Sequence, residues 1–376
     1  MKKICTVIGA RPQFIKLSVV SRVLRREFQE VLIHTGQHYD YNMSGVFFQE
    51  LGIPEPDYNL GISGGSHGQM TGRMLAELEN VLQREAPDML LVFGDTNSTM
   101  AAALAAVKLH IPVCHVEAGN RMGSLENPEE VNRIVTDHVS SLCLACTNTA
   151  LEFLEREGIG ERSRLTGDPM YDAFLYYSER VEDQEYMELE DIDGGPVRLP
   201  NEFYYMTCHR QENTDTDEKL DQILQAMDAL DAPVVYPVHP RNCGRADRLR
   251  LEKGYRHPLS VDRPSQLEKG YRNTLLVAPV GYRCSVFLVN RAKKIITDSG
   301  GLQREAFFAG RPCVTVFDRA IWPETMVNHC NQLARPNKED ILSKLEAVPF
   351  FDFKYRPFGD GHSAEKITEA ITNFLA

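Results

Sequence analysis

The sequence is poor in tryptophan, with one residue in 376, and it lacks long apolar runs and a basic excess. No stretch approaches the roughly 18 unbroken apolar residues of a membrane-spanning helix. Lys and Arg total 41 against 53 Asp and Glu, a net charge of −12, which argues against a general nucleic-acid or anionic-membrane binder. A local cationic site can still bind an anion, so a phosphate-bearing ligand stays open.

Two nucleotide-binding glycine motifs are also missing. There is no G-x-x-x-x-G-K-[ST] loop, and the glycine cluster at 61–65 follows no strand-like run, so we expect neither a P-loop nor NAD. The single C-x-x-C pair, Cys143 and Cys146, lies in the apolar run SLCLACT. We interpret the nine cysteines as reduced core residues of a cytoplasmic protein, and we expect no metal and no cofactor.

What is present is an alternation of short apolar runs with amphipathic segments, which predicts an α/β fold. The N-terminus begins with two lysines, as signal peptides do, but its apolar run covers only residues 4–10 and favours a first strand. We interpret an acidic stretch at 179–200 as a solvated linker or acidic surface loop, and a binding site for a partner is the alternative. The predicted strands are 4–9, 30–36, 88–95, 112–119, 142–147, 203–209, 233–239, 274–280, 294–299 and 313–317.

This order predicts two Rossmann-like, doubly wound domains with a ligand cleft between them. We place the first domain at 1–180 and the second at 200–358. Residues 359–376 contain a final helix, which we expect to pack back on the first domain. Open α/β sheets bind ligands at the carboxyl ends of their strands, and nearly every predicted strand here ends in polar residues.

One strand end predicts an anion site. Ser299, Gly300 and Gly301 follow Asp298 and open a helix, where backbone N–H groups attract phosphate. Arg11 and His209 after other strands strengthen the case. Ser299 can at the same time be a simple helix cap.

Other strand ends carry carboxylates. Asp95 and Glu117 end neighbouring apolar strands, and Glu129 opens a helix four residues before Arg133. Taken singly, Asp95 can cap a helix, and Glu129 with Arg133 can form a surface ion pair. Taken together, the three acids suggest a cluster whose members raise one another's pKa, which suits acid–base catalysis near neutral pH.

These residues lie in motifs that resemble those of the non-hydrolysing UDP-N-acetylglucosamine 2-epimerases. The resemblance covers nearly the whole chain, and its motifs occur in matching order and spacing. They are GARPQFIK (9–16), TGQHYD (35–40), GDTNST (94–99), HVEAGNR (115–121), PEEVNR (128–133), TGDPMYDA (166–173), HRQENT (209–214), YPVHPR (236–241), TDSGGLQREA (297–306), WPE (322–324) and FGDGHSAEKI (358–367).

The resemblance implies a GT-B-like fold, a UDP-sugar substrate bound between the domains, a homodimer and a role in cell-surface polysaccharide synthesis. The implied reaction inverts C2 of the sugar by anti-elimination of UDP to a 2-acetamidoglucal, followed by re-addition. The missing NAD fingerprint is compatible with elimination, since inversion through oxidation would need that cofactor.

The resemblance also implies residue roles. It assigns acid–base catalysis to Asp95, Glu117 and Glu129, the first acid of the PEE motif, and it places His209 near the diphosphate. The implied substrate-binding positions are Arg11, Lys16, Arg133, His239, Ser299, Gly300, Gly301 and Glu305. For His239 the alternative is simple packing under the uridine.

The sequence departs from the family pattern at some positions. Gln13 stands where many relatives have Glu, and Trp322 replaces a common Arg. Gln37 and His38 match an allosteric segment, but 67–73 does not reproduce its second part. GARPQFIK and HGQMTGRML also resemble the branch that acts on UDP-2,3-diacetamido-glucuronic acid. A GT-B glycosyltransferase, a hydrolysing 2-epimerase and a sugar-nucleotide sensor are the alternative functions.

Overall fold

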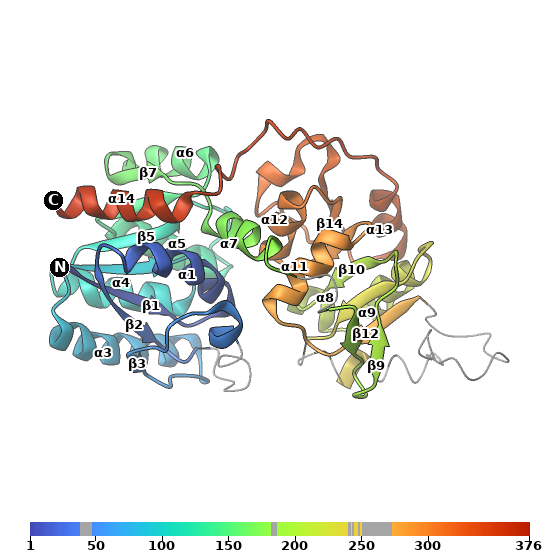
Figure 1. The fold of residues 1–376 in the computed structure, drawn as a ribbon, viewed down its shortest axis with the longest axis horizontal. Helices are drawn as coiled ribbons and strands as arrows, with labels where there is room; N and C mark the ends of the chain where they lie inside the picture. Colours follow the sequence, from blue (N-terminus) through green and yellow to red (C-terminus); the bar gives the residue numbers. More distant parts are fainter. Residues whose placement is uncertain (38–46, 182–185, 240–241, 243, 247–248, 250–272) are drawn as a thin grey trace. The chain divides into compact units, whose positions relative to one another are not determined.

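The computed structural model describes residues 1–37, 47–181, 186–239, 242, 244–246, 249 and 273–376. The chain forms two compact units (Figure 1). The first unit comprises Met1–Tyr176 and Lys354–Ala376, and the second comprises Tyr177–Phe353. Among the described residues, no helix combines the length and apolar character of a membrane span.

The first unit is built on a seven-stranded parallel sheet with the order β3-β2-β1-β4-β5-β6-β7. Its central strands are almost wholly buried, as expected for a parallel sheet covered on both faces. The strands are β1 (Lys3–Ile8), β2 (Gln29–His34), β3 (Tyr58–Asn59), β4 (Met89–Phe93), β5 (Val113–Ala118), β6 (Leu142–Ala145) and β7 (Ser163–Leu165).

Helices cover both faces of this sheet. On one face, Cys5 and Val7 of β1 share a core with α3 and α4. On the other face, the hydroxyls of Thr6 and of Ser21 in α1 both donate to the Glu30 carboxylate. The last helix, α14, packs against α1, and the Lys2 ammonium donates to the Leu375 carbonyl. The helices are α1 (Arg11–Leu24), α3 (His67–Glu85), α4 (Asn97–Lys108), α5 (Pro128–Val139), α6 (Asn148–Arg156), α7 (Pro169–Ser178) and α14 (Ser363–Leu375).

The second unit repeats the plan with a six-stranded parallel sheet in the order β12-β11-β10-β13-β14-β15. Its apolar core joins the sheet to α9 and α13. The strands are β10 (Tyr204–Thr207), β11 (Val234–Pro237), β12 (Thr274–Val277), β13 (Ile295–Thr297), β14 (Cys313–Val316) and β15 (Asn331–Ala334). The helices are α8 (Gln211–Thr214), α9 (Asp217–Asp228), α11 (Tyr282–Arg291), α12 (Gly300–Phe308) and α13 (Lys338–Leu345).

The acidic stretch predicted to be a linker is partly folded. Its described residues contain an antiparallel pair, β8 (Glu188–Glu190) and β9 (Pro196–Arg198). The pair docks on the edge of the second sheet, where Ala278 N–H donates to the Glu190 carbonyl at 2.8 Å. The linker interpretation was therefore wrong for this segment, because the acidic side chains obscure a hairpin whose buried residues, Leu189 and Val197, face inward.

The two large sheets share one topology. In each, the chain runs outward from a first strand, then returns to that strand's other side, so the order reverses between β1 and β4 and between β10 and β13. Such a reversal opens a crevice at the carboxyl ends of the strands, where α/β folds bind ligands. The predicted site residues follow these strands.

Candidate active site

Glu117 is the most constrained of the predicted acids. It is the second-to-last residue of β5, has a left-handed backbone with φ +69°, and is only 5% exposed. This conformation costs a residue with a β-carbon about 1 kcal/mol or more, and such strain concentrates at functional sites. The Lys16 ammonium, from α1, lies 2.5 Å from Glu117 Oε2 and neutralises its charge.

Gly94 leaves room for this ion pair. Its φ is +63°, and a β-carbon there would lie 3.4 Å from Lys16 Nζ and 3.7 Å from Glu117 Oε1. A glycine in the loop after β4 thus satisfies the backbone and allows the ion pair to approach the end of the sheet.

Asp95 and Arg133 form a second ion pair at this edge. Asp95 does not cap α4, because Thr96 accepts the capping hydrogen bond from Thr99 N–H. Arg133 is buried; burial opposes its charge, but Asp95 and then Glu117 raise the pKa of its guanidinium, which therefore stays charged. The structure thus links Asp95 and Glu117 through one arginine.

The two acids of the PEE motif have different surroundings. Glu130 is buried and accepts hydrogen bonds from Met122 N–H and Gly123 N–H, each at 2.9 Å, so it holds the loop after β5. Glu129 is exposed on the first turn of α5. Arg133 pairs with Asp95 and Glu130 rather than with Glu129, so the expected surface ion pair does not form.

A buried network with no local sequence pattern supports this edge. His115 Nδ1 lies 2.6 Å from Asp137, and His115 Nε2 lies 2.6 Å from the Gly94 carbonyl. Arg121 bonds the other Asp137 oxygen at 2.7 Å. Burial opposes ionisation of Asp137, but His115 and Arg121 lower its pKa. The network fixes the Gly94 loop between the ends of β4 and β5.

Other predicted residues surround these strand ends. Arg11 stacks over the Phe47 ring at 4.3 Å, and the Gln37 amide oxygen accepts from Ser98 N–H and the Ser98 hydroxyl. His38 lies outside the described residues. The Gln13 amide oxygen accepts from Gly9 N–H and Ala10 N–H, and its NH₂ group donates to the Phe93 carbonyl. These bonds join α1 to the end of β4. An ionised glutamate at this position has no donor for the Phe93 carbonyl.

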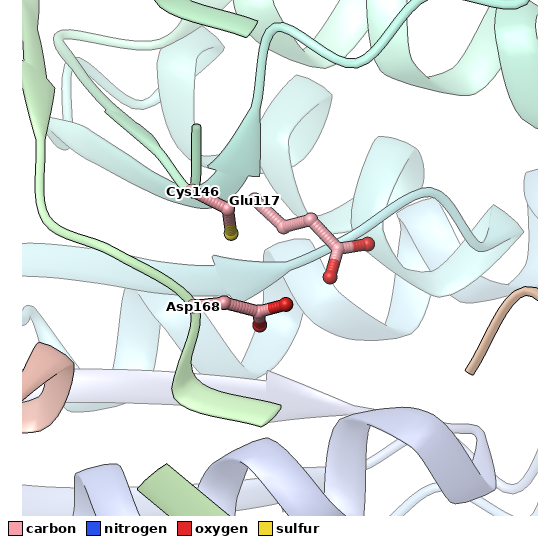
Figure 2. A group of neighbouring side chains, drawn as sticks. All are labelled: Glu117, Cys146 and Asp168. Carbon is pink, nitrogen blue, oxygen red and sulfur yellow. The ribbon is translucent and has the colours of Figure 1, made fainter. Parts of the chain in front are cut away.

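Asp168 and Cys146 place further polar groups beside Glu117, and neither is among the site residues predicted from the sequence. The side chains come from three separate segments and point into one small space (Figure 2). One ligand atom from each lies within 4.8 Å of the others, and all three residues are buried. These donor types can bind a metal, but the Lys16 ammonium already lies against Glu117 and supplies a positive charge.

In the second unit, His209 follows β10 and is held by Asp298, which follows β13. Asp298 is fully buried; its carboxylate lies 3.0 Å from His209 Nδ1 and accepts from the backbone N–H groups of His209 and Arg210. Burial alone would raise the Asp298 pKa, but these hydrogen bonds and the His209 charge lower it to about 2. The His209 side chain remains 41% exposed, and its ring stacks on that of His239.

The helix start predicted to bind an anion lies at the same edge. Ser299 is the N-cap of α12 and accepts from Leu302 N–H, so its capping role is real. Among the described residues, a β-carbon on Gly301 would meet only Ser299 Oγ, at 3.7 Å, and one on Gly300 would meet nothing closer than 3.6 Å. The first turn of α12 is therefore open to a ligand. Glu305 is buried on this helix, and Trp322 is buried under the Arg304 guanidinium.

Comparison with known proteins identifies the family. A family model described as UDP-N-acetylglucosamine 2-epimerase matches residues 22–372. The chain belongs to the UDP-N-acetylglucosamine 2-epimerase family. Members of this family are isomerases, and the predicted fold of two Rossmann-like domains agrees with the structure and with the family's solved structures.

Three relatives of this epimerase-family chain show the range of the resemblance. A UDP-N-acetylglucosamine 2-epimerase homolog from Methanococcus maripaludis is 43% identical over 99% of both chains. The UDP-2,3-diacetamido-2,3-dideoxy-D-glucuronate 2-epimerase of Pseudomonas aeruginosa is also 43% identical, over 98% of this chain and 99% of its own. The crystal structure of Methanocaldococcus jannaschii UDP-GlcNAc 2-epimerase with UDP-GlcNAc and UDP has a TM-score of 0.82, at 35% identity, over 99% of both chains.

Proposed function

We propose that this protein is a non-hydrolysing 2-epimerase of a UDP-2-acetamido sugar, interconverting UDP-GlcNAc and UDP-ManNAc or a closely related pair. The observation that carries the proposal is the division of chemistry between two sheet edges in a chain of this family. One edge holds carboxylates paired with cations, and the other holds a histidine and an open helix start.

The carboxylate edge supplies the proton transfers. Asp95, Glu117 and Glu129 are the acid–base candidates, and Lys16 and Arg133 hold the first two in place. One carboxylate takes the C2 proton as the C1–O bond breaks and its electron pair leaves with UDP. A 2-acetamidoglucal results, and protonation on the opposite face with return of UDP to C1 completes the inversion.

The second edge supplies stabilisation of the departing diphosphate. His209 is oriented by Asp298 and remains partly exposed, so its ring can donate to a phosphate oxygen. The open first turn of α12, at Ser299, Gly300 and Gly301, adds backbone N–H groups. We assign Arg11, His239 and Glu305 to binding of the UDP-sugar.

The identity of the sugar and the assembly of the protein complete the proposed function. The relatives at 43% identity carry different names, so UDP-GlcNAc and UDP-2,3-diacetamido-glucuronate are both substrates to test.

We further propose a cytoplasmic homodimer that supplies precursors of cell-surface polysaccharide. Light scattering coupled to size exclusion tests the dimer, because a monomeric mass contradicts it.

The decisive experiment is proton NMR of the protein with each UDP-sugar in D₂O. We expect the C2 epimer to appear with deuterium at C2, without any acceptor. Retention of the original hydrogen at C2 contradicts elimination. Stoichiometric release of UDP and free ManNAc indicates a hydrolysing enzyme, and turnover only after an acceptor is added indicates a glycosyltransferase. No turnover under any of these conditions indicates a sensor.

A further inference from the structure

A second buried carboxylate lies beside Glu117. Asp168 is fully buried, Glu117 is 5% exposed, and a carboxylate oxygen of each lies within 4.8 Å of the other (Figure 2). Asp168 also caps α7, because its Oδ1 accepts from Met170 N–H at 2.9 Å. Capping explains an acid at this position but does not require it to lie next to a strained catalytic candidate.

Charged and titratable groups from several elements lie around the pair. Glu117 faces Lys16 from α1, Arg133 from α5 and the Cys146 thiol after β6. Asp168 faces Glu117 and Cys146, and it is close enough to raise the pKa of Asp172 on α7. Burial is the main reason that the Asp172 pKa reaches about 6, and hydrogen bonds from the chain at Ala364 and Ser363 oppose the shift. Arg133 is also bound to Asp95, and the Lys16 ammonium lies against Glu117.

We propose that Asp168 is a positioning residue whose charge sets the pH range in which Glu117 accepts a proton. Two carboxylates at this separation cannot both ionise as readily as one alone, so the pair holds a proton to higher pH. In the elimination, the C2 proton passes to Glu117, the C1–O electron pair leaves on UDP, and a C1=C2 double bond forms. In this proposal Asp168 acts through Glu117 rather than on the sugar itself. This inference rests on the function proposed above.

The test is Asp168→Asn, which removes the charge and keeps a good helix cap. The acidic limb of the kcat/KM profile reports the group that must lose a proton. Without the neighbouring charge that group ionises more readily, so we expect the limb to move by about one pH unit to lower pH. The KM for the UDP-sugar should stay within about twofold of wild type. A limb that coincides with that of wild type overturns the inference.

Asp172→Asn is the matched control. Asp172 is also buried near the start of α7, but its carboxylate accepts from Ala364 N–H. We expect this variant to lower the melting temperature and to leave the acidic limb unmoved. An equal shift in both variants indicates a general effect of α7 and overturns the specific role of Asp168.

A second measurement does not depend on turnover. The protein is labelled with ¹³C at the aspartate carboxyl, and the carboxyl signals are followed by NMR as the pH changes. The Asp168 signal is assigned by its loss in Asp168→Ser. We expect Asp168 to titrate at lower pH in Glu117→Gln than in wild type. Identical titrations overturn the pairing. If wild type epimerises neither UDP-sugar, the proposed function fails, and the titration still decides whether Asp168 and Glu117 are coupled. If wild type epimerises and the acidic limb of the kcat/KM profile does not move in Asp168→Asn, only the inference about Asp168 fails.

Discussion

The two units use one strand order for different electrostatics. At the edge of the first sheet, Lys16 and Arg133 are engaged with carboxylates. At the edge of the second sheet, among the described residues, the only carboxylate that contacts His209 is that of Asp298, which is fully buried. The same topology can therefore serve proton transfer in one unit and anion binding in the other, because side chains at the strand ends, not the fold, decide the chemistry.

Glu117→Gln should have the largest effect, because it removes a proposed proton acceptor from the first edge while retaining its shape. We expect kcat to fall by about 10³-fold, with little change in KM, in the NMR epimerisation assay. Glu30→Gln is the control, since Glu30 is also buried but lies at the opposite end of the first sheet. It should lower the melting temperature and leave kcat within about twofold. If Glu117→Gln keeps a tenth of wild-type kcat, the first edge does not carry the proton transfer.

Asp298→Asn tests whether the second edge depends on a buried charge. The folded-state pKa of Asp298, about 2, lies below its ordinary value of 3.8, so the ionised form stabilises the fold above pH 4. We expect a loss of about 2 kcal/mol in the free energy of unfolding at pH 7. The loss should shrink as the pH falls from 4 towards 2, where wild type also protonates.

Urea unfolding at pH 7 and at pH 3 measures this difference. Asp231→Asn is the control, because Asp231 bonds Lys293 and Tyr204 at the surface of the same unit and should cost less. An Asp298→Asn loss that is equal at both pH values contradicts the assignment of the effect to its charge.

Gly301→Ala should have the smallest effect and sharpens the anion-site assignment. Within the described part of the chain, the added methyl meets only Ser299 Oγ, at an ordinary contact distance, so the fold should tolerate it. We expect KM for the UDP-sugar to rise about fivefold, roughly 1 kcal/mol, with kcat unchanged, because the methyl would occupy space at the proposed anion site.

Gly72→Ala is the control for this substitution. Gly72 lies inside α3 of the first unit with open space around its added β-carbon. It should leave KM unchanged and stabilise the protein by about 0.5 to 1 kcal/mol, as alanine is the better helix former. A KM increase equal to that of Gly301→Ala would contradict an anion site at α12.

Periodicity and strand-end rules predicted ten of the strands near their observed positions and directed attention to Asp95, Glu117, His209 and Ser299. The missed strands are short or depend on distant partners; the β8–β9 hairpin, for example, is completed by residues near 277. The His115–Asp137 pair spans 22 residues and has no local pattern. The left-handed backbone of Glu117 was equally hidden, since no rule places a glutamate there.

The packing of α14 on α1 has a consequence for protein synthesis. The first unit is discontinuous, because a segment made after the whole second unit completes it. On the ribosome, residues 177–353 are therefore synthesised before the carboxylate-bearing unit receives its last helix, so that unit is completed last although its sheet is made first. A nascent chain released before residue 363 would carry every proposed catalytic residue and still lack the helix that covers α1.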